Sequence, residues 1–281
     1  MCTHETRLPI TFVTKEESNK REQWFDNFKY PVLNIITLLQ EGVQENTKLD
    51  FEDITSAIDF FNRLIAGLEK DTDGVRMYFA SPSGSGKVEA GKCGILTLIF
   101  CATKGAEKSD VKIYYTLDRK KVITIPENEA RDWVHNYQNV KRNILFETLS
   151  DFDRLNNCKE TKHVWFSLRQ MKETIHEMEC QSERSSKISG FGIRFVSYTN
   201  QDYYFPEPKE EEFKKRQRLT LAFTFMDTLK LDIGIEDINK EEFDQRYEAT
   251  IHEIYGDTFD TGDPTPPPPT GNKADLDVLD E

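Results

Sequence analysis

Residues 74–79, Gly-Val-Arg-Met-Tyr-Phe, have a counterpart much later in the chain in residues 192–197, Gly-Ile-Arg-Phe-Val-Ser. In both stretches a glycine comes first and apolar side chains alternate with an arginine, the two-residue period of a β-strand. A second apolar run follows each of them: residues 96–100, Leu-Thr-Leu-Ile-Phe, and residues 219–223, Leu-Thr-Leu-Ala-Phe. We therefore predict two similar antiparallel strand pairs, each joined by a long loop.

A helix opening also occurs twice, upstream of these strands. Residues 23–28, Gln-Trp-Phe-Asp-Asn-Phe, correspond to residues 132–137, Asp-Trp-Val-His-Asn-Tyr. In each, the tryptophan and the aromatic residue four positions later lie on one helix face, where we expect core packing. Three blocks that recur in the same order are typical of an internal repeat, so the sequence predicts a tandem duplication.

Each copy is expected to open with a strand, at residues 10–13 and 121–125. A Thr-x-x-Glu capping box, which would begin a helix, starts at Thr14 in the first copy and at Thr124 in the second. Apolar residues at three- and four-residue spacing then predict a second helix in each copy. These residues are Ile54, Ile58, Phe61 and Ile65 in the first copy, and Leu168, Met171, Ile175 and Met178 in the second.

The predicted fold class is therefore α+β: a tandem duplication of a strand–helix–helix–strand–strand unit with mostly antiparallel sheet. Residues 8–117 form the first copy, and residues 118–256 form the second together with a C-terminal helix over residues 239–255. Residues 257–281 are acidic and contain five of the chain's prolines, so we expect a disordered tail there.

The duplicated G-[VI]-R and L-T-L strands, the W-x-x-N-[FY] helix and the prolines at 266–269 resemble a group of uncharacterised proteins from Bacteroidota. The resemblance covers most of residues 8–230. It implies a fold and a source organism group, and it implies no activity.

The amino-acid composition indicates which classes of partner and which cellular location to expect. The formal net charge is −13, which disfavours nucleic acid, since phosphate backbones are bound by clustered Lys and Arg. Residues 1–13 are too polar for a signal peptide, and no apolar run is long enough to cross a membrane. We therefore expect no membrane partner. The five cysteines include no C-x-x-C pair, so we expect free thiols and a cytoplasmic location.

Two motifs imitate ligand sites. Residues 81–88, Ser-Pro-Ser-Gly-Ser-Gly-Lys-Val, resemble a phosphate-binding P-loop, but the first glycine and the hydroxyl after the lysine are missing, and no helix can follow. Cys158, His163, His176 and Cys180 are zinc-ligand types, yet their spacing is not that of a zinc site. We therefore expect no cofactor and no metal, and a solvated loop around Lys87.

Arg76 and Arg194 occupy equivalent positions in the two copies. Either they pair with nearby carboxylates, or they bind an anion, for which a guanidinium is suited. No catalytic motif is present, so the sequence favours a non-enzymatic protein-interaction or accessory protein whose partner is another protein. The alternative is a small-ligand or anion-binding sensor that uses the crevice between the copies, and an enzyme of unfamiliar type is the third. An exposed apolar patch would favour the first, and a deep polar pocket the others.

Overall fold

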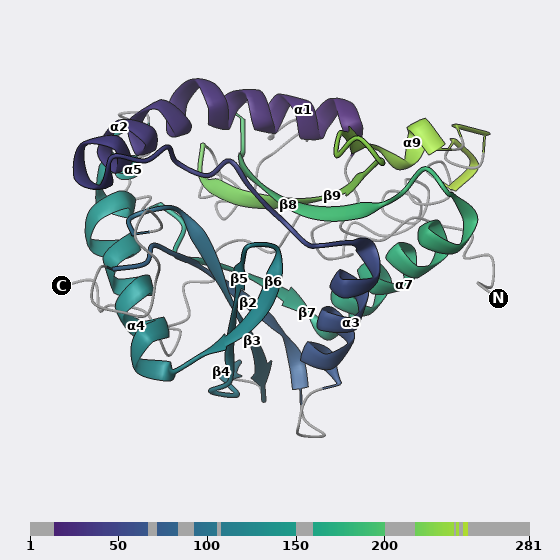
Figure 1. The fold of residues 1–281 in the computed structure, drawn as a ribbon, viewed down its shortest axis with the longest axis horizontal. Coiled ribbons are helices and arrows are strands. Elements are labelled where there is room, and N and C mark those ends of the chain that lie inside the picture. The colour runs from purple at the N-terminus through teal and green to yellow at the C-terminus, as the bar shows by residue number, and fades with distance from the viewer. Residues whose placement is uncertain are drawn as a thin grey trace, which may run out of the picture.

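The protein is described by a computed structural model, which defines residues 14–66, 72–83, 93–105, 108–149, 160–199, 217–238, 240–241 and 244–246. Two sheets face each other across an apolar core. Helices cover the sides of the sheets that face away from this core, and they also close one end of it (Figure 1). All strand pairs in the described residues are antiparallel. The fold class is therefore α+β with antiparallel sheets, as the sequence predicts.

The elements follow the chain in two similar series. The first half contains α1 (Lys15–Trp24), the π-helical segment η1 (Phe25–Lys29), α2 (Tyr30–Glu41), β1 (Lys48–Asp50), α3 (Ile54–Ile65), β2 (Thr72–Ala80), β3 (Thr97–Lys104), β4 (Ser109–Asp110) and β5 (Tyr114–Asp118). The second half contains β6 (Lys121–Ile125), α4 (Glu127–Asn136), the π-helical segment η2 (Tyr137–Arg142), α5 (Asn143–Phe146), β7 (His163–Ser167), α7 (Leu168–Arg184), β8 (Gly190–Ser197), β9 (Leu219–Met226), β10 (Asp232–Ile233) and α9 (Ile235–Ile238).

Several predicted elements are confirmed. Helix α3 and strand β6 have the bounds read from the sequence, and α7 begins at Leu168. The predicted strand pairs are β2 with β3 and β8 with β9. The two halves also share the order helix with a π segment, short strand, helix, strand, strand. The duplication as the origin of this order stays a prediction, which a superposition of the two halves tests.

Two strands that the sequence analysis missed connect the halves. Strand β1 of the first half pairs with β8, and β7 of the second half pairs with β2. The sheets are therefore ordered β1-β8-β9-β10 and β6-β5-β3-β2-β7, with β4 beside β3. Each sheet takes strands from both halves, so neither half builds its sheet alone.

These crossings explain the glycine that opens each G-[VI]-R strand. Gly74 lies opposite Ser167 in β7, and Gly192 lies opposite Asp50 in β1. A Cβ on Gly74 would come within 2.3 Å of the carbonyl oxygen of Phe166. A Cβ on Gly192 would come within 2.8 Å of Oδ1 of Asp50. The glycines allow the close approach of the strand that crosses from the other half.

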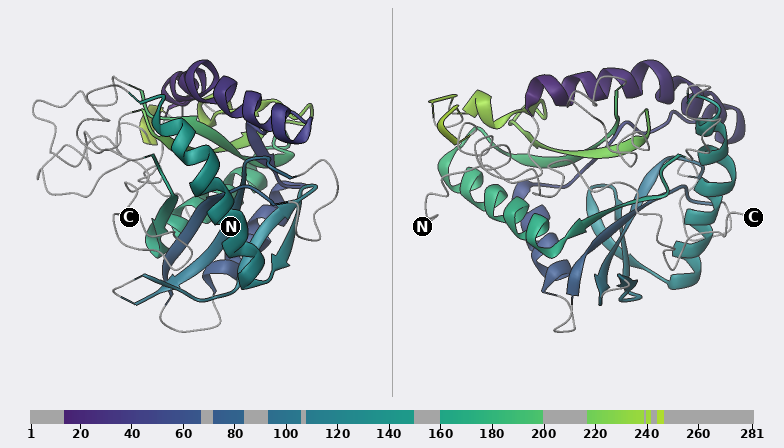
Figure 2. Two further views of the ribbon diagram at one scale, coloured as in Figure 1. Left: turned by 90° about the vertical axis from the view of Figure 1, so that its left-hand side faces the viewer. Right: turned by 180° about the vertical axis from the view of Figure 1, so that it is seen from behind.

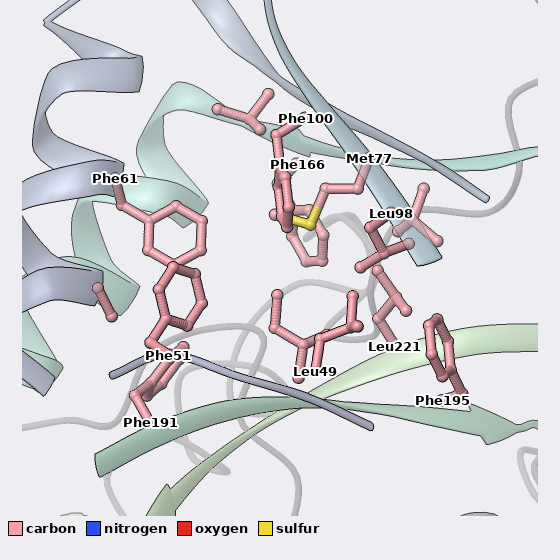
Figure 3. Close-up of a cluster of buried hydrophobic side chains, with 14 of the residues drawn as sticks. Leu49, Phe51, Phe61, Met77, Leu98, Phe100, Phe166, Phe191, Phe195 and Leu221 are labelled. Carbon is pink, nitrogen blue, oxygen red and sulfur yellow. The ribbon is translucent and has the colours of Figure 1, made fainter. Parts of the chain in front are cut away.

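The main core lies between the two sheets (Figure 3). Phe100 and Phe166 point inward from the larger sheet, and Phe191 and Leu221 from the smaller one. Helices α3 and α7 pack against each other and close one side, with Phe61 of α3 reaching the rings of the smaller sheet. The space between the sheets is thus filled with apolar side chains, whose burial is the main stabilising contribution to the fold.

Different helices cover the sides of the two sheets that face away from the core. Helix α1 lies along the smaller sheet and contacts β8, while α4 packs on β2 of the larger sheet (Figures 1 and 2). Beneath α4, a second cluster contains Tyr78, Tyr114 and Trp133. None of the described helices is long and apolar enough to cross a bilayer.

Two local predictions are wrong. The first concerns the aromatic residues of the repeated helix opening, which we expected in the core. Trp133 and Tyr137 are buried as expected. Trp24, however, is half-buried and Phe28 is 49% exposed.

The second error concerns the capping boxes. The hydroxyl of Thr14 accepts a hydrogen bond from the backbone N–H of Glu17 at 3.2 Å, so this residue caps α1 as predicted. Thr124, however, lies within β6, and α4 begins after Pro126 without a side-chain cap. The backbone of Thr124 pairs with Tyr115 of β5. The strand extends through this threonine and displaces the predicted cap.

Some predicted features lie outside the described residues: the strand at 10–13, the loop around Lys87 and the tail at 257–281. Of the predicted C-terminal helix, residues 240–241 and 244–246 are described, and they are helical. Arg246 in this segment pairs with Glu177 of α7 at 2.6 Å. The first regular element after the P-loop-like stretch in the described chain is strand β3.

Candidate functional site

Arg76 points from β2 to the side of the larger sheet that faces away from the core, and it is almost fully buried. Its guanidinium donates to Asp110 at 2.5 Å and to the backbone carbonyl of Lys108 at 2.8 Å. The hydroxyls of Tyr78 and Tyr114 also donate to Asp110, at 2.6 and 3.3 Å. Burial raises the pKa of Tyr78 well above its usual value, and the neighbouring Asp110 adds to this shift. Arg76 and Asp110 thus satisfy each other within the fold.

Arg194 has the equivalent place in β8 and faces the outer side of the smaller sheet. Its guanidinium donates to Asp50 at 2.9 Å and binds Asp232 through both carboxylate oxygens. The inward neighbours Ile193 and Phe195 belong to the core between the sheets. Since Arg76 and Arg194 project away from that core, the structure does not bring the two predicted positions together. Both guanidiniums are held by carboxylates of this chain.

A pair of buried charges that the sequence analysis missed joins the two halves. Lys29, the last residue of η1, donates to Glu160 at 2.6 Å and to the hydroxyl of Thr148 at 2.8 Å. Both charged side chains are almost completely buried. Glu160 also accepts from the backbone N–H groups of Thr161 at 2.9 Å and Leu219 at 2.7 Å. The carboxylate therefore anchors the start of β9 to the helix of the first half.

The same arrangement occurs in the opposite direction. Lys141 of η2 forms a buried ion pair with Glu45 and donates to the hydroxyl of Thr37 at 2.6 Å. Glu45 accepts from the backbone N–H groups of Asn46 at 2.9 Å and Leu96 at 2.5 Å. Burial lowers the pKa of Lys141, and the charge of Glu45 opposes this effect. Each half thus supplies a lysine to the other half's glutamate.

The zinc-ligand types do not form a metal site in the described residues. Sγ of Cys180 lies 3.5 Å from Nε2 of His176 on α7, but Cys180 is in a disulfide whose partner is outside the described residues. Our expectation of free thiols is therefore wrong for this cysteine, while Cys93 and Cys101 are free. His163 is buried in β7 beside the ring of Tyr78. No group of three or more His, Cys, Asp or Glu side chains suited to a metal occurs in the described part of the chain.

The helix of the first half carries an unusual apolar surface, which we call the outer face: Trp24, Phe28, Ile35, Leu38 and Leu39. The last four are 49, 57, 43 and 82% exposed, and the rings of Trp24 and Phe28 lie 4.5 Å apart. The buried side of the same helix holds Lys29 and Thr37 together with Phe25 and Leu33. Helix α2 therefore buries Leu33 and Thr37 but leaves Ile35, Leu38 and Leu39 exposed, so much of its apolar surface does not serve the chain's own core.

The second half provides an internal comparison for the outer face. Lys29 and Leu33 correspond to Lys141 and Leu145, since each lysine forms the crossed ion pair and each leucine carbonyl accepts from a threonine of the buried cluster. With this alignment, Trp24, Phe28 and Ile35 correspond to Asn136, Val140 and Glu147. The helix of the second half ends at Phe146, so Asn136 and Val140 lie within it and Glu147 follows its last residue. Positions 150 and 151, which would correspond to Leu38 and Leu39, lie outside the described residues. The exposed part of α2 therefore has no helical counterpart in the described second half.

Comparison with protein-family models, with curated proteins and with solved structures gave no match to this chain. What the chain does is therefore inferred from its own residues.

Proposed function

We propose that this chain is a non-enzymatic protein-interaction or accessory protein, and that it binds its partner through the outer face of α1, η1 and α2. The observation that carries this proposal is the exposure of large apolar side chains along one side of a helix whose buried side holds the charged Lys29. Contiguous apolar surface of this kind is typical of protein–protein contacts. Trp24 and Phe28 are the expected anchors, because aromatic residues contribute most to binding free energy at interfaces.

The alternative, a small-ligand or anion-binding sensor between the copies, has less support. Arg76 and Arg194 both bind carboxylates of the chain and project away from the space between the sheets. That space is occupied by the apolar cluster of Figure 3. An anion at either arginine would have to displace a carboxylate that already makes several hydrogen bonds.

The test is affinity capture from an extract of the source organism with three forms of the protein. These are the wild type, the variant Ile35→Glu/Leu39→Asp and the control variant Leu229→Glu. Leu229 is 76% exposed in the turn before β10, outside the outer face. We expect a protein that the wild type and the control retain and the double variant loses. Retention of the same proteins by all three forms would show that the outer face is not the interaction surface.

The cytoplasmic location and the kinship with Bacteroidota proteins remain parts of this proposal. The formal net charge of −13 supports a protein partner over nucleic acid. The disulfide of Cys180 is the observation that favours an oxidising compartment instead. Cell fractionation with an antibody against the chain distinguishes the two locations.

A further inference from the structure

Arg218, directly before β9, carries a buried charge that the described residues do not neutralise. The residue is 7% exposed, and its Nε atom is buried without a hydrogen-bond partner. Neither Nη atom bonds a carboxylate or a carbonyl within the described chain. The backbone of Arg218 is fixed, since its carbonyl accepts from the N–H of Tyr198 at 3.0 Å and from the hydroxyl of Ser197 at 3.1 Å. The side chain is therefore held in the fold while its guanidinium has no partner there.

An unpaired guanidinium inside a protein is strongly destabilising. Arginine does not lose its proton in proteins, so Arg218 cannot become neutral in response to burial. Buried charges in folded proteins are accordingly paired with an opposite charge and hydrogen-bonded. The other two arginines in strands follow this rule, since Arg76 binds Asp110 and Arg194 binds Asp50. The exception at Arg218 indicates an anion that the described residues do not supply.

The strand pattern places Arg218 on the side of the smaller sheet that α1 covers. Leu219 and Leu221 belong to the core between the sheets, so Arg218 faces the opposite side. Tyr198, which bonds the carbonyl of Arg218, alternates in the same way with the core residue Phe195. Helix α1 lies along this side and contacts β8 (Figure 1). Arg218 and Tyr198 are therefore neighbours beneath α1.

Helix α1 brings a second buried arginine to the same place. Arg21 is 3% exposed, and its Cζ atom lies 5.0 Å from the centre of the Tyr198 ring, which is also buried. Arg21 donates to Glu17 at 2.6 Å, and the side chain of Glu17 is 41% exposed. Two buried guanidiniums thus lie around one tyrosine, and Glu17 is the carboxylate that the described residues bring to them. The site has an excess of positive charge.

We propose that Arg218, together with Arg21 and Tyr198, forms a binding site for a small oxyanion beneath α1. The ligand is the phosphate or carboxylate group of a small molecule, because the planar fork of a guanidinium binds either group through two parallel hydrogen bonds. Arg218 makes the principal contact, since its donors are not used by the described chain. The inference is independent of the proposed function, because none of these side chains belongs to the outer face.

The experiment measures the melting temperature of the full chain in phosphate, acetate and chloride at equal ionic strength and neutral pH. Phosphate should raise the melting temperature of the wild type saturably, by roughly 5 °C or more at about a hundred times its Kd. Arg218→Met should lose this rise, and in chloride it should melt no lower than the wild type, because it removes an unpaired buried charge. The control Arg131→Met, at an exposed arginine of α4 that pairs with Glu127, should keep the rise.

A second variant covers the case in which Arg218→Met does not fold. Arg218→Lys keeps the charge but loses the fork, so phosphate should bind it roughly tenfold more weakly, as expected for the loss of one charge-assisted hydrogen bond. The acetate arm distinguishes the two ligand groups. A larger rise in phosphate identifies a phosphate group, an equal or larger rise in acetate identifies a carboxylate, and both results support the site.

Three results would overturn the inference. The first is a wild type whose melting temperature neither anion raises above that in chloride. The second is an equal rise in the wild type and in the variants at Arg218, which would reflect the general stabilising effect of phosphate on proteins. The third is a variant Arg218→Met that melts well below the wild type in chloride, without a response to either anion. An acid of the chain would then hold Arg218, and residues 200–216 contain five acids that could do so.

Discussion

Lys29 and Lys141 each form a buried ion pair that could not be predicted from the sequence. Each lysine lies in a helical segment next to apolar residues. Its glutamate partner is far away in the sequence: 131 residues for Lys29 and 96 residues for Lys141. Local patterns cannot pair residues so distant. The arginines of the two G-[VI]-R strands were noticed because they stand in a repeated motif, and even there the sequence left ion pairing and anion binding open.

The crossed ion pairs predict a specific pattern of stability. Lys141→Met should lower the free energy of unfolding by about 3–5 kcal/mol, because it leaves Glu45 buried without an opposite charge. Lys141→Met combined with Glu45→Gln should recover part of this loss. The exposed pair of Lys20 with Glu16 serves as a control, where Lys20→Met should change stability by less than about 1 kcal/mol. Urea unfolding of the four proteins measures these changes, and similar losses in Lys141→Met and Lys20→Met would argue against the crossed pairs.

At the scale of elements, the sequence predicted what short-range patterns determine. The stripe of α3 and the alternation in β2 and β8 are complete within a few residues, and these elements lie where expected. Strand β1 has three residues, too few for a pattern, although β7 with Val164, Trp165 and Phe166 carries a strand signal that could have been read. The face that α2 buries could not be read from periodicity, since apolar residues lie on both its buried and its exposed sides.

Asp26 of η1 predicts a pH effect on stability. Burial raises the pKa of Asp26 in the folded chain, so the folded state binds this proton more tightly than the unfolded state. The carboxylate therefore destabilises the fold above its folded pKa, and this effect disappears as the pH falls through that pKa towards the unfolded value. Asp26→Asn should stabilise the protein at neutral pH, with a gain that shrinks as the pH falls towards about 4, the pKa of an aspartate in the unfolded chain. Thermal melts of both proteins over this range test the sign, and a variant that is less stable at neutral pH would contradict it.

For the whole molecule, the exchange of β1 and β7 between the sheets makes the two halves dependent on each other. The repeat predicted from the sequence suggested two units placed one after the other. It did not indicate that each unit contributes a strand to the other unit's sheet and a lysine to the other unit's buried glutamate. Both features depend on contacts between residues far apart in the chain. We therefore expect neither residues 8–117 nor residues 118–256 to fold alone.

The cysteines provide a second test at this scale. Because Cys180 is in a disulfide, reduction should raise the number of thiols that react under denaturing conditions by two. Cys101 is buried and burial raises its pKa, so it should react only after unfolding. Thiol titration of the protein before and after reduction measures both. An unchanged count would restore the original expectation of free thiols.

The central claim is that the outer face of α1, η1 and α2 serves a partner and not the chain's own core. Its most direct test is the unfolding free energy of Ile35→Glu/Leu39→Asp, measured by chemical denaturation against the wild type. The account predicts a change within about 1 kcal/mol, because both side chains are exposed and substitutions of exposed side chains have small effects. A loss of more than about 3 kcal/mol, as expected when buried apolar side chains are replaced by charges, would show that the chain covers this face itself and would contradict the account.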